Sequence, residues 1–290
     1  MQLFSGNLVQ RGTCRLAALA CCLLVLSAAV ADDILDARSG QALTRADLLA
    51  RLAKADWVLL GERHDNPRHH DARAALLREL GVGRVVLEHL DQGAQLKHEV
   101  PLEQALDQAG YNRKGWRWPM QQNLFEAMHQ TGTRMQGGNL SRADGRKVAI
   151  QGEPAVDSEL AALIAAAPLP DYAQARLDVS LNQGHCGQLP AARLPNMRLA
   201  QRARDAAMAR SLLAEQGRAV LLAGNGHVRL DYGVPSLLKV ARPAARLVSV
   251  GFVESVAEGG EVADDNFAYD YLWVTAPSER PDPCLNLKIP

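Results

Sequence analysis

Glutamates and histidines recur in this chain directly after short apolar runs. The runs lie at residues 57–60, 85–87 and 219–223. A carboxylate beside an imidazole can act as an acid–base pair or bind a divalent metal ion. The polar residues that follow the runs are Glu62, His64, Glu88, His89 and His227. We predict that they form one site, with Glu62, His64, Glu88 and His227 as candidate catalytic residues and the last three as candidate metal ligands.

The three apolar runs predict strands that are buried on both faces of a sheet. In an open α/β sheet, the residues just past the carboxyl ends of the strands line the ligand crevice. A helical pattern from Pro67 to Leu80, with Gly81 as its stop, separates the first two runs. A strand, a helix and a strand within about 30 residues form a βαβ unit, so these two strands should be parallel.

The rest of the chain alternates between helical and strand patterns. Further helices are predicted at residues 45–52, 99–109, 124–131, 158–167 and 196–216 and from Val234 onward, and further strands at 134–136, 247–253 and 271–274. The predicted fold class is α/β, a mostly parallel sheet flanked by helices. Residues 32–280 form the domain, with a smaller helical lobe at about 92–195, and residues 281–290 form an extended tail.

The N-terminal segment, residues 1–31, has the pattern of a secretory signal peptide. Arg11 and Arg15 precede an apolar run from Leu16 to Leu26, and small residues allow cleavage after Ala31. The alternative is lipidation at Cys21, which would tether the protein to a membrane. No later segment is apolar enough to be expected to span a bilayer.

Charge and cysteine content narrow the classes of partner. The chain has 32 basic and 32 acidic residues, without the basic excess that nucleic-acid binding needs. No glycine-rich dinucleotide fingerprint, phosphate loop or serine nucleophile elbow is present. Beyond the signal segment the cysteines are Cys186 and Cys284. In an oxidising compartment they could pair, or they could be unrelated thiols, and the spacing alone leaves both open.

The candidate site residues each have an ordinary alternative. Glu62 and His64 lie two apart, which can point both side chains the same way after a strand. Glu88 ends an apolar strand, so it needs a partner, which could be a histidine, a metal ion or the arginine of a plain salt bridge. His69 and His70 stand at a helix start, where they either join the site or face solvent.

A second group of residues is aromatic. Tyr111, Trp116 and Trp118 lie within nine residues of one another, in a polar setting. Aromatic side chains at this density are often core residues, but the polar neighbours favour a surface or a cleft wall.

These residues resemble those of the ChaN-like haem-binding uptake family, part of a wider Tiki-like group. The resemblance spans roughly residues 45–255. It is carried by Leu59-Leu60-Gly61-Glu62-Arg63-His64-Asp65-Asn66-Pro67-Arg68-His69-His70, by the strand at 85–89, by the run from Asn196 through Arg204-Asp205 to Ala209, and by Ala223-Gly224-Asn225-Gly226-His227 and Gly233-Val234-Pro235.

The resemblance implies a periplasmic bacterial protein, in some cases a membrane-anchored lipoprotein, that binds haem for iron uptake without turning it over. It implies an axial tyrosine or histidine on the iron. The residues expected to contact haem are Tyr111, Trp116, Trp118, His69 and His70. An outer-membrane haem receptor, a membrane tether and a homodimer are the further partners that it leaves open.

The same resemblance implies an alternative, because some members of the Tiki-like group are hydrolases. A metal-dependent esterase or peptidase would use the Glu/His cluster to bind a divalent metal such as zinc, or to activate a water. One position departs from the family: Gln121 stands where relatives often carry a tyrosine. A phenolate is a good ligand for ferric haem and glutamine is not. If the iron ligand of the family lies at this position, then in this protein either Tyr111 or a histidine replaces it, or the haem role is lost.

Overall fold

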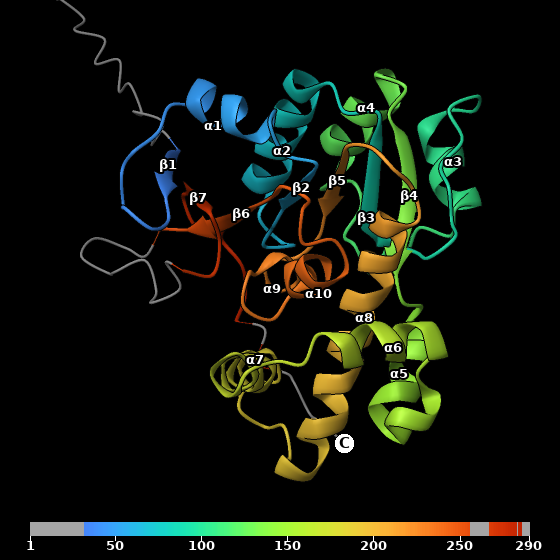
Figure 1. Cartoon of the computed structure of the whole chain (residues 1–290). Coiled ribbons are helices and arrows are strands. Elements are labelled where there is room, and N and C mark those ends of the chain that lie inside the picture. The colour runs from blue at the N-terminus through green and yellow to red at the C-terminus, as the bar shows by residue number, and fades with distance from the viewer. Residues whose placement is uncertain (1–31, 256–266, 283, 286–290) are drawn as a thin grey trace, which may run out of the picture. The chain divides into compact units, whose positions relative to one another are not determined.

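A single mixed sheet organises the protein. The computed structural model describes residues 32–255, 267–282 and 284–285, so the signal-peptide prediction for residues 1–31 lies outside the described residues. Within them, seven strands form the sheet in the order β1-β7-β6-β2-β5-β3-β4 (Figure 1). The strands are β1 (Asp33–Asp36), β2 (Trp57–Leu60), β3 (Arg84–Asp91), β4 (Arg134–Asn139), β5 (Ala219–Leu222), β6 (Leu247–Glu254) and β7 (Tyr271–Thr275).

The sheet is mostly parallel, which confirms the predicted fold class. Only the β1–β7 pair is antiparallel within the described residues. The strands β2 and β3 run parallel, as predicted, but they are not neighbours. The strand β5 inserts between them and pairs with both, with Leu222 beside Leu60 and Leu87. The ends of all three predicted strands therefore lie together at one edge.

Helices cover both faces of the sheet. They are α1 (Arg45–Leu52), α2 (Pro67–Leu80), α3 (Leu102–Gln108), α4 (Gln122–Gln130), α5 (Arg142–Gln151), α6 (Ser158–Ala166), α7 (Asp171–Gly184), α8 (Leu194–Leu213), α9 (Asn225–Val228) and α10 (Val234–Ala241), with single 3₁₀ turns at Glu153–Ala155 and Ala191–Arg193. The predicted bounds of α1 and α2 are confirmed. Asn66 caps α2, Pro67 opens it, and Gly81 ends it with a φ of 56°.

The alternation of side chains along β2 divides the core into two layers. Val58 and Leu60 pack under α1, α2 and α4, whereas Trp57 and Leu59 pack against α8 and α10. All four are buried, as expected for a central strand with helices on both faces. The position of β2 is therefore fixed from both sides, and so is the loop that follows it.

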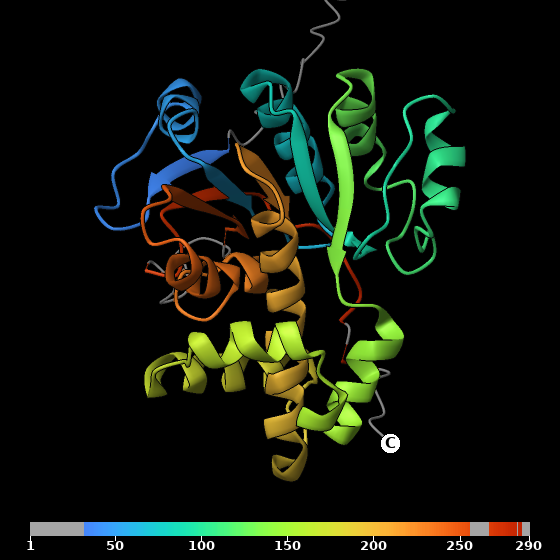
Figure 2. The ribbon, with the colours of Figure 1, turned by 45° about the vertical axis from the view of Figure 1, so that its right-hand side comes forward.

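The region predicted as a helical lobe divides in two. The helices α3 and α4 pack in the same core layer as α2, and β4 is an edge strand of the sheet. The helices α5, α6 and α7 instead pack along α8, where this helix extends beyond the sheet (Figure 2). The sequence patterns missed β1, α5 and α7.

In the described part of the chain, no helix combines the length and apolar content needed to cross a bilayer.

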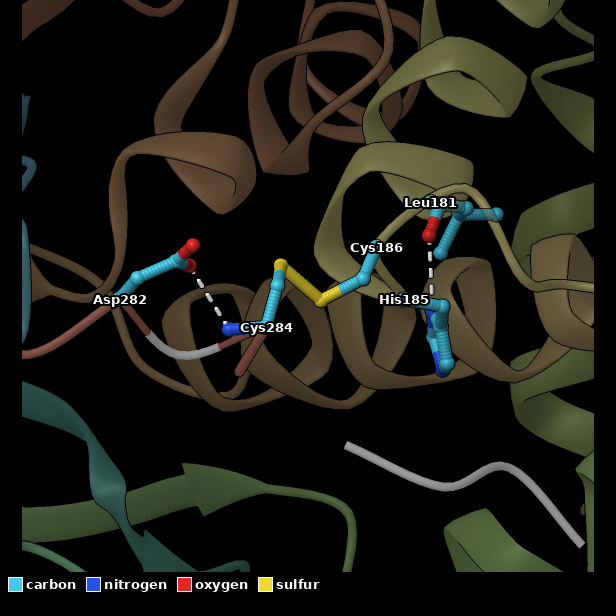
Figure 3. Close-up of a disulfide and its surroundings, with 5 residues drawn as sticks. All are labelled: Leu181, His185, Cys186, Asp282 and Cys284. Atoms are coloured by element: carbon cyan, nitrogen blue, oxygen red, sulfur yellow. Dashed lines mark hydrogen bonds between the residues drawn. A yellow bond between two sulfur atoms is a disulfide. The ribbon is translucent and has the colours of Figure 1, made fainter. Parts of the chain in front are cut away.

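A disulfide joins Cys186, after α7, to Cys284 in the C-terminal tail (Figure 3). It settles the two alternatives that the spacing left open. The backbone N–H of Cys284 also donates to the Asp282 carboxylate over 2.8 Å. The described part of the tail is therefore attached to the helical layer as well as to the sheet.

We predict that Cys284→Ser lowers the free energy of unfolding. The bond closes a loop with a sequence separation of 98 residues, and loss of such a cross-link costs up to about 4 kcal/mol through the entropy of the unfolded chain. Chemical denaturation measures the loss. A reductant should lower the unfolding free energy of the wild type to that of the variant and leave the value for the variant unchanged. An unfolding free energy of the wild type that does not respond to reductant contradicts the prediction.

Candidate functional site

The predicted acidic and histidine residues meet at the carboxyl ends of β2, β3 and β5. His64 Nε2 lies 3.9 Å from Glu88 Oε1, and His227 Nε2 lies 3.3 Å from the same oxygen. The side chains that follow the three predicted strands therefore lie close together, as expected from a parallel sheet. Gly224 makes this approach possible, because a Cβ there would lie 2.8 Å from His64 Nε2.

The Glu62 carboxylate is the buried centre of the site. It is 2% exposed. Its Oε1 lies 2.6 Å from His64 Nδ1 and 3.2 Å from His89 Nε2. Its Oε2 pairs with the guanidinium of Arg73 and lies 3.2 Å from His70 Nδ1. Both oxygens are therefore held, as a buried carboxylate requires.

Sequence reasoning missed Arg73. The residue is fully buried on α2, three positions after His70, so both side chains lie on the helix face that points at Glu62. An arginine at that spacing, on a face that otherwise carries Ala74 and Leu77, was the available signal.

A second chain of contacts links Glu88, His227 and Asp205. His227 Nδ1 lies 2.6 Å from Asp205 Oδ1, and the Gly224 N–H donates to Glu88 Oε2 over 2.6 Å. Asp205, on α8, was not among the predicted site residues. Its contact with His227 joins residues that are 22 positions apart in the chain, so the sequence spacing alone does not predict it.

The charges in this chain determine which proton each group holds. Burial alone would lower the pKa of His227, but the carboxylates of Glu88 and Asp205 outweigh it and raise the pKa to about 10. Burial would raise the pKa of Glu88, but His227, His64 and the Gly224 amide hold it well below its usual range. Burial raises the pKa of Asp205. At neutral pH, His227 is an imidazolium between two acids.

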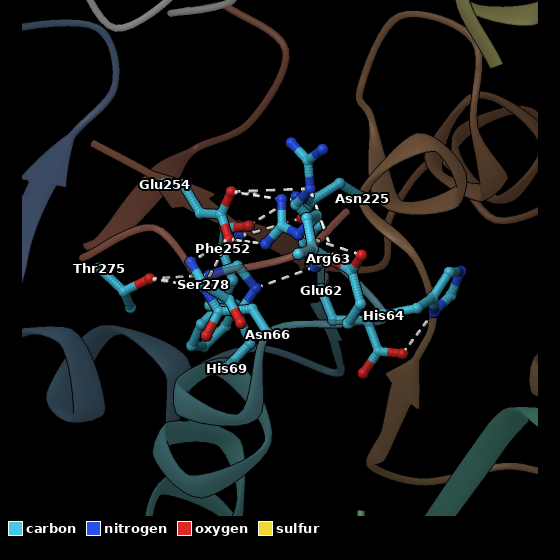
Figure 4. Close-up of polar contacts among 12 residues, drawn as sticks. Glu62, Arg63, His64, Asn66, His69, Asn225, Phe252, Glu254, Thr275 and Ser278 are labelled. Carbon is cyan, nitrogen blue, oxygen red and sulfur yellow. Dashed lines mark hydrogen bonds and ion pairs between the residues drawn. The ribbon is translucent and has the colours of Figure 1, made fainter. Parts of the chain in front are cut away.

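His69 and His70 are both fully buried, so neither faces solvent. His70 belongs to the Glu62 cluster. His69 accepts a hydrogen bond from the Arg63 N–H and lies 3.0 Å from Thr275 Oγ1. In Figure 4, His69 lies among Asn66 and Thr275, whereas His64 points away from them. His69 thus helps to fix the backbone just before His64.

Two pockets share Gly115 and Trp116 as lining residues. The first, which we call the His64 pocket, has a volume of about 290 Å³ and is lined by Arg63, His64, Asp65, Gly115, Trp116 and Arg117. The second, the Glu88 pocket, has a volume of about 420 Å³, and its lining includes Glu88, His89, Asp91, Asn139, Arg142 and Arg204. We call the two together the groove.

The aromatic residues divide between the groove and the core. Trp116 is half-buried and packs on His64 and His89, with ring centroids 5.1 and 4.5 Å away. Tyr111 is buried and donates its hydroxyl to Gln121 Oε1 over 3.1 Å. Trp118 is half-buried against Tyr111 and Phe125. The predicted cleft wall is therefore Trp116, whereas Tyr111 is a core residue.

The geometry does not support the predicted metal site. Among the residues that the structure describes, no group of three or more His, Cys, Asp or Glu side chains is arranged to hold a metal ion. His64, Glu88 and His227 lie close together. However, Glu88 already pairs with His227 and the Gly224 N–H, and His227 also pairs with Asp205.

The fold and site define an α/β protein with a polar cluster at the ends of its parallel strands. A sequence model of the family described as haem-binding uptake, Tiki superfamily, ChaN matches residues 48–238. The match covers more than half of the chain, so the protein belongs to that family. A search of curated protein sequences found no match.

A solved structure shows the same fold, and others are more distantly similar. A structure described as cofacial haem binding to ChaN of Campylobacter jejuni has a TM-score of 0.69 and 20% identity, covering 83% of this chain and 96% of that one. The type III effector HopBA1 has a TM-score of 0.40 and 15% identity, covering 80% and 93% of the two chains. RRSP, a MARTX toxin effector domain from Vibrio vulnificus, has a TM-score of 0.37 and 14% identity, covering 79% and 37%.

We predict that Arg73→Met destabilises the protein by about 3–5 kcal/mol, because it leaves the buried Glu62 carboxylate without its cation. Chemical denaturation measures the effect. Arg78→Met, on the exposed side of the same helix, is the matched control and should change stability by less than about 0.5 kcal/mol. Equal effects of the two variants would show that the Glu62–Arg73 pair contributes nothing special.

We also predict that stability falls as the pH drops from about 6.5 to 4. Burial lowers the pKa of His69 and of His70 to about 4. As the pH falls below about 6.5, these histidines become protonated in the unfolded chain before they do in the folded protein, which stabilises the unfolded state. His227 acts in the other direction: its raised pKa contributes stability that is lost as the pH rises from about 6.5 to 10. Denaturation at pH 7, 6 and 5 should show the acid decline, and a flat profile over that range contradicts it.

Proposed function

We propose that this protein binds haem in the groove around Trp116 and holds it, without turnover, as a step in iron uptake. Membership of the haem-binding uptake family supports the ligand. The observation that carries the proposal for this chain is the half-buried Trp116 ring, which lines both pockets beside His64. A flat aromatic ring next to an imidazole offers a porphyrin both an apolar contact and a ligand for its iron.

The size and charge of the groove fit such a ligand. Its pockets, of about 290 and 420 Å³, together fall within the usual range for small-molecule sites, about 300–1,000 Å³. Four arginines line the groove, two in each pocket, and guanidinium groups suit the two carboxylates that haem carries.

His64 is the residue that we propose as the iron ligand. Its side chain is 45% exposed and its Nδ1 lies 2.6 Å from Glu62 Oε1. Its Nε2 lies 3.9 Å from Glu88 Oε1, beyond hydrogen-bond distance, and is the nitrogen available to a metal. Metal-bound histidines are commonly held in this way by a carboxylate on the other ring nitrogen. Tyr111 fits the role poorly, because it is buried and burial raises the pKa of its phenol, which disfavours a phenolate.

The hydrolase alternative receives less support from the same cluster. A general base works best when its pKa lies near the working pH. The pKa of His227 is raised to about 10, and that of Glu88 is held well below its usual range. At neutral pH His227 already carries its proton, and Glu88 is an ionised carboxylate that is only a weak base, so neither is suited to take a proton from water. These electrostatics favour a carrier over an enzyme.

Secretion completes the proposal. The signal-like pattern at residues 1–31 supports export to the periplasm, with a lipid at Cys21 as the alternative that would add a membrane tether. A carrier in that compartment would receive haem from an outer-membrane receptor. A homodimer is compatible with this role, and size-exclusion chromatography with and without haem would detect it.

We predict that purified protein gives a Soret band that titrates to a fixed stoichiometry with added haem. His64→Ala should shift the band and weaken binding at least about tenfold, because it removes the imidazole–iron bond. Tyr111→Phe should leave the band unchanged, because it removes only a hydroxyl that is bound to Gln121. Absorption titration of the wild type and of the two variants measures these effects.

The controls separate ligation from folding. His98→Gln changes a half-buried histidine that lines neither pocket of the groove and should bind haem like the wild type. A wild-type spectrum no different from that of free haem in the same buffer would end the haem proposal. Loss of the band in Tyr111→Phe, with retention in His64→Ala, would reassign the ligand.

A further inference from the structure

The arginines of the two pockets differ in their partners. In the His64 pocket, Arg63 lies 3.7 Å from Asp65 and 3.6 Å from Glu254, and Arg117 lies 3.8 Å from Asp65. These two guanidinium groups already have carboxylates close by. In the Glu88 pocket, neither Arg142 nor Arg204 pairs with any carboxylate of the described residues. The groove thus keeps two unneutralised cations, both on one side.

Arg204 is held in place by neutral groups. Its Nη1 donates to Asn139 Oδ1 over 3.1 Å and to the Leu140 carbonyl over 3.4 Å. Asn139 is 7% exposed and is itself fixed, since its Nδ2 donates to the Glu88 carbonyl over 3.0 Å. Gly145 lets the guanidinium lie against α5, because a Cβ there would come within 2.7 Å of Nη2. Such a fork, preorganised without a counter-ion, suits an incoming carboxylate.

The acids of the same pocket do not compete for this cation. Glu88 is engaged by the Gly224 amide and by His227. Asp91 is exposed and forms no ion pair with either arginine among the described residues. Arg142 is exposed at the first position of α5, on the rim of the pocket. A ligand carboxylate could therefore contact Arg204 and Arg142 without displacing an existing ion pair.

We propose that Arg204 and Arg142 form a carboxylate-binding subsite, and that it receives the propionate side chains of the porphyrin. The inference rests on the proposed function, and it adds an orientation: the carboxylate edge of the ligand faces the Glu88 pocket. The His64 pocket, whose arginines are already paired, takes the rest of the ring. Specificity for the acid form of the ligand then comes from Arg204 and Arg142, and iron ligation from His64.

The test compares haem with haem dimethyl ester, which has the same ring and iron but no free carboxylate. Both are titrated in one detergent-containing buffer against the wild type, Arg204→Ala, Arg204→Lys and Arg142→Ala. Arg146→Ala, an exposed arginine of α5 that does not line the pocket, is the matched control. Arg204→Lys keeps the charge but loses the two-pronged donor.

The wild type and Arg146→Ala should bind haem at least tenfold more tightly than the ester. In Arg204→Ala that ratio should fall toward one, because haem binding weakens while ester binding stays constant. Arg142→Ala and Arg204→Lys should give intermediate ratios. Since each ratio compares two ligands on one protein, a partly unfolded variant does not mimic the result.

Two different failures are distinguishable. If the wild type binds haem and its ester equally, or if Arg204→Ala weakens both alike, the subsite is overturned and the haem site stands. If neither ligand gives a spectrum distinct from that of the free compound, the proposed function itself fails. A ratio that falls equally in Arg146→Ala would show a general charge effect and would also overturn the subsite.

Discussion

The burial of the Glu62 carboxylate is the constraint on which the site depends. A carboxylate without water needs partners for both oxygens, or it takes up a proton. Arg73 supplies the positive charge, and His64, His70 and His89 surround the oxygens. His64 is one of these partners and is the exposed residue among them. Its position is therefore set by its contact with the buried Glu62 carboxylate. The side chain proposed to bind iron is thus oriented by the core.

The strand order brings this cluster together. Residues that are distant in the chain meet because β5 lies between β2 and β3 and all three run in the same direction. Gly61 and Gly224 then let the segments after β2 and β5 approach closely, since a Cβ at Gly61 would lie 2.2 Å from the Asn225 side chain. The groove beside Trp116 is therefore a product of the topology, and the loop at 111–119 only adds one wall to it.

The sequence predicted what periodicity and chain order encode, and missed what depends on tertiary contacts. The helix at Pro67–Leu80 was readable because its cap, proline and glycine are local signals. The meeting of His64, Glu88 and His227 was readable because parallel strands end at one edge. Arg73, Asp205 and the burial of His69 were not, because arginine and aspartate are mostly exposed and histidine is found both inside and outside the core. Only the neighbouring strand ends make those positions interior.

The same electrostatics that hold the site together fix the protonation state of His227. His227 faces a carboxylate at each ring nitrogen, so each N–H of the imidazolium points at an anion and its proton is costly to remove. A residue in that state braces Glu88 and the Gly224 turn against His64, but it cannot take a proton from water at neutral pH.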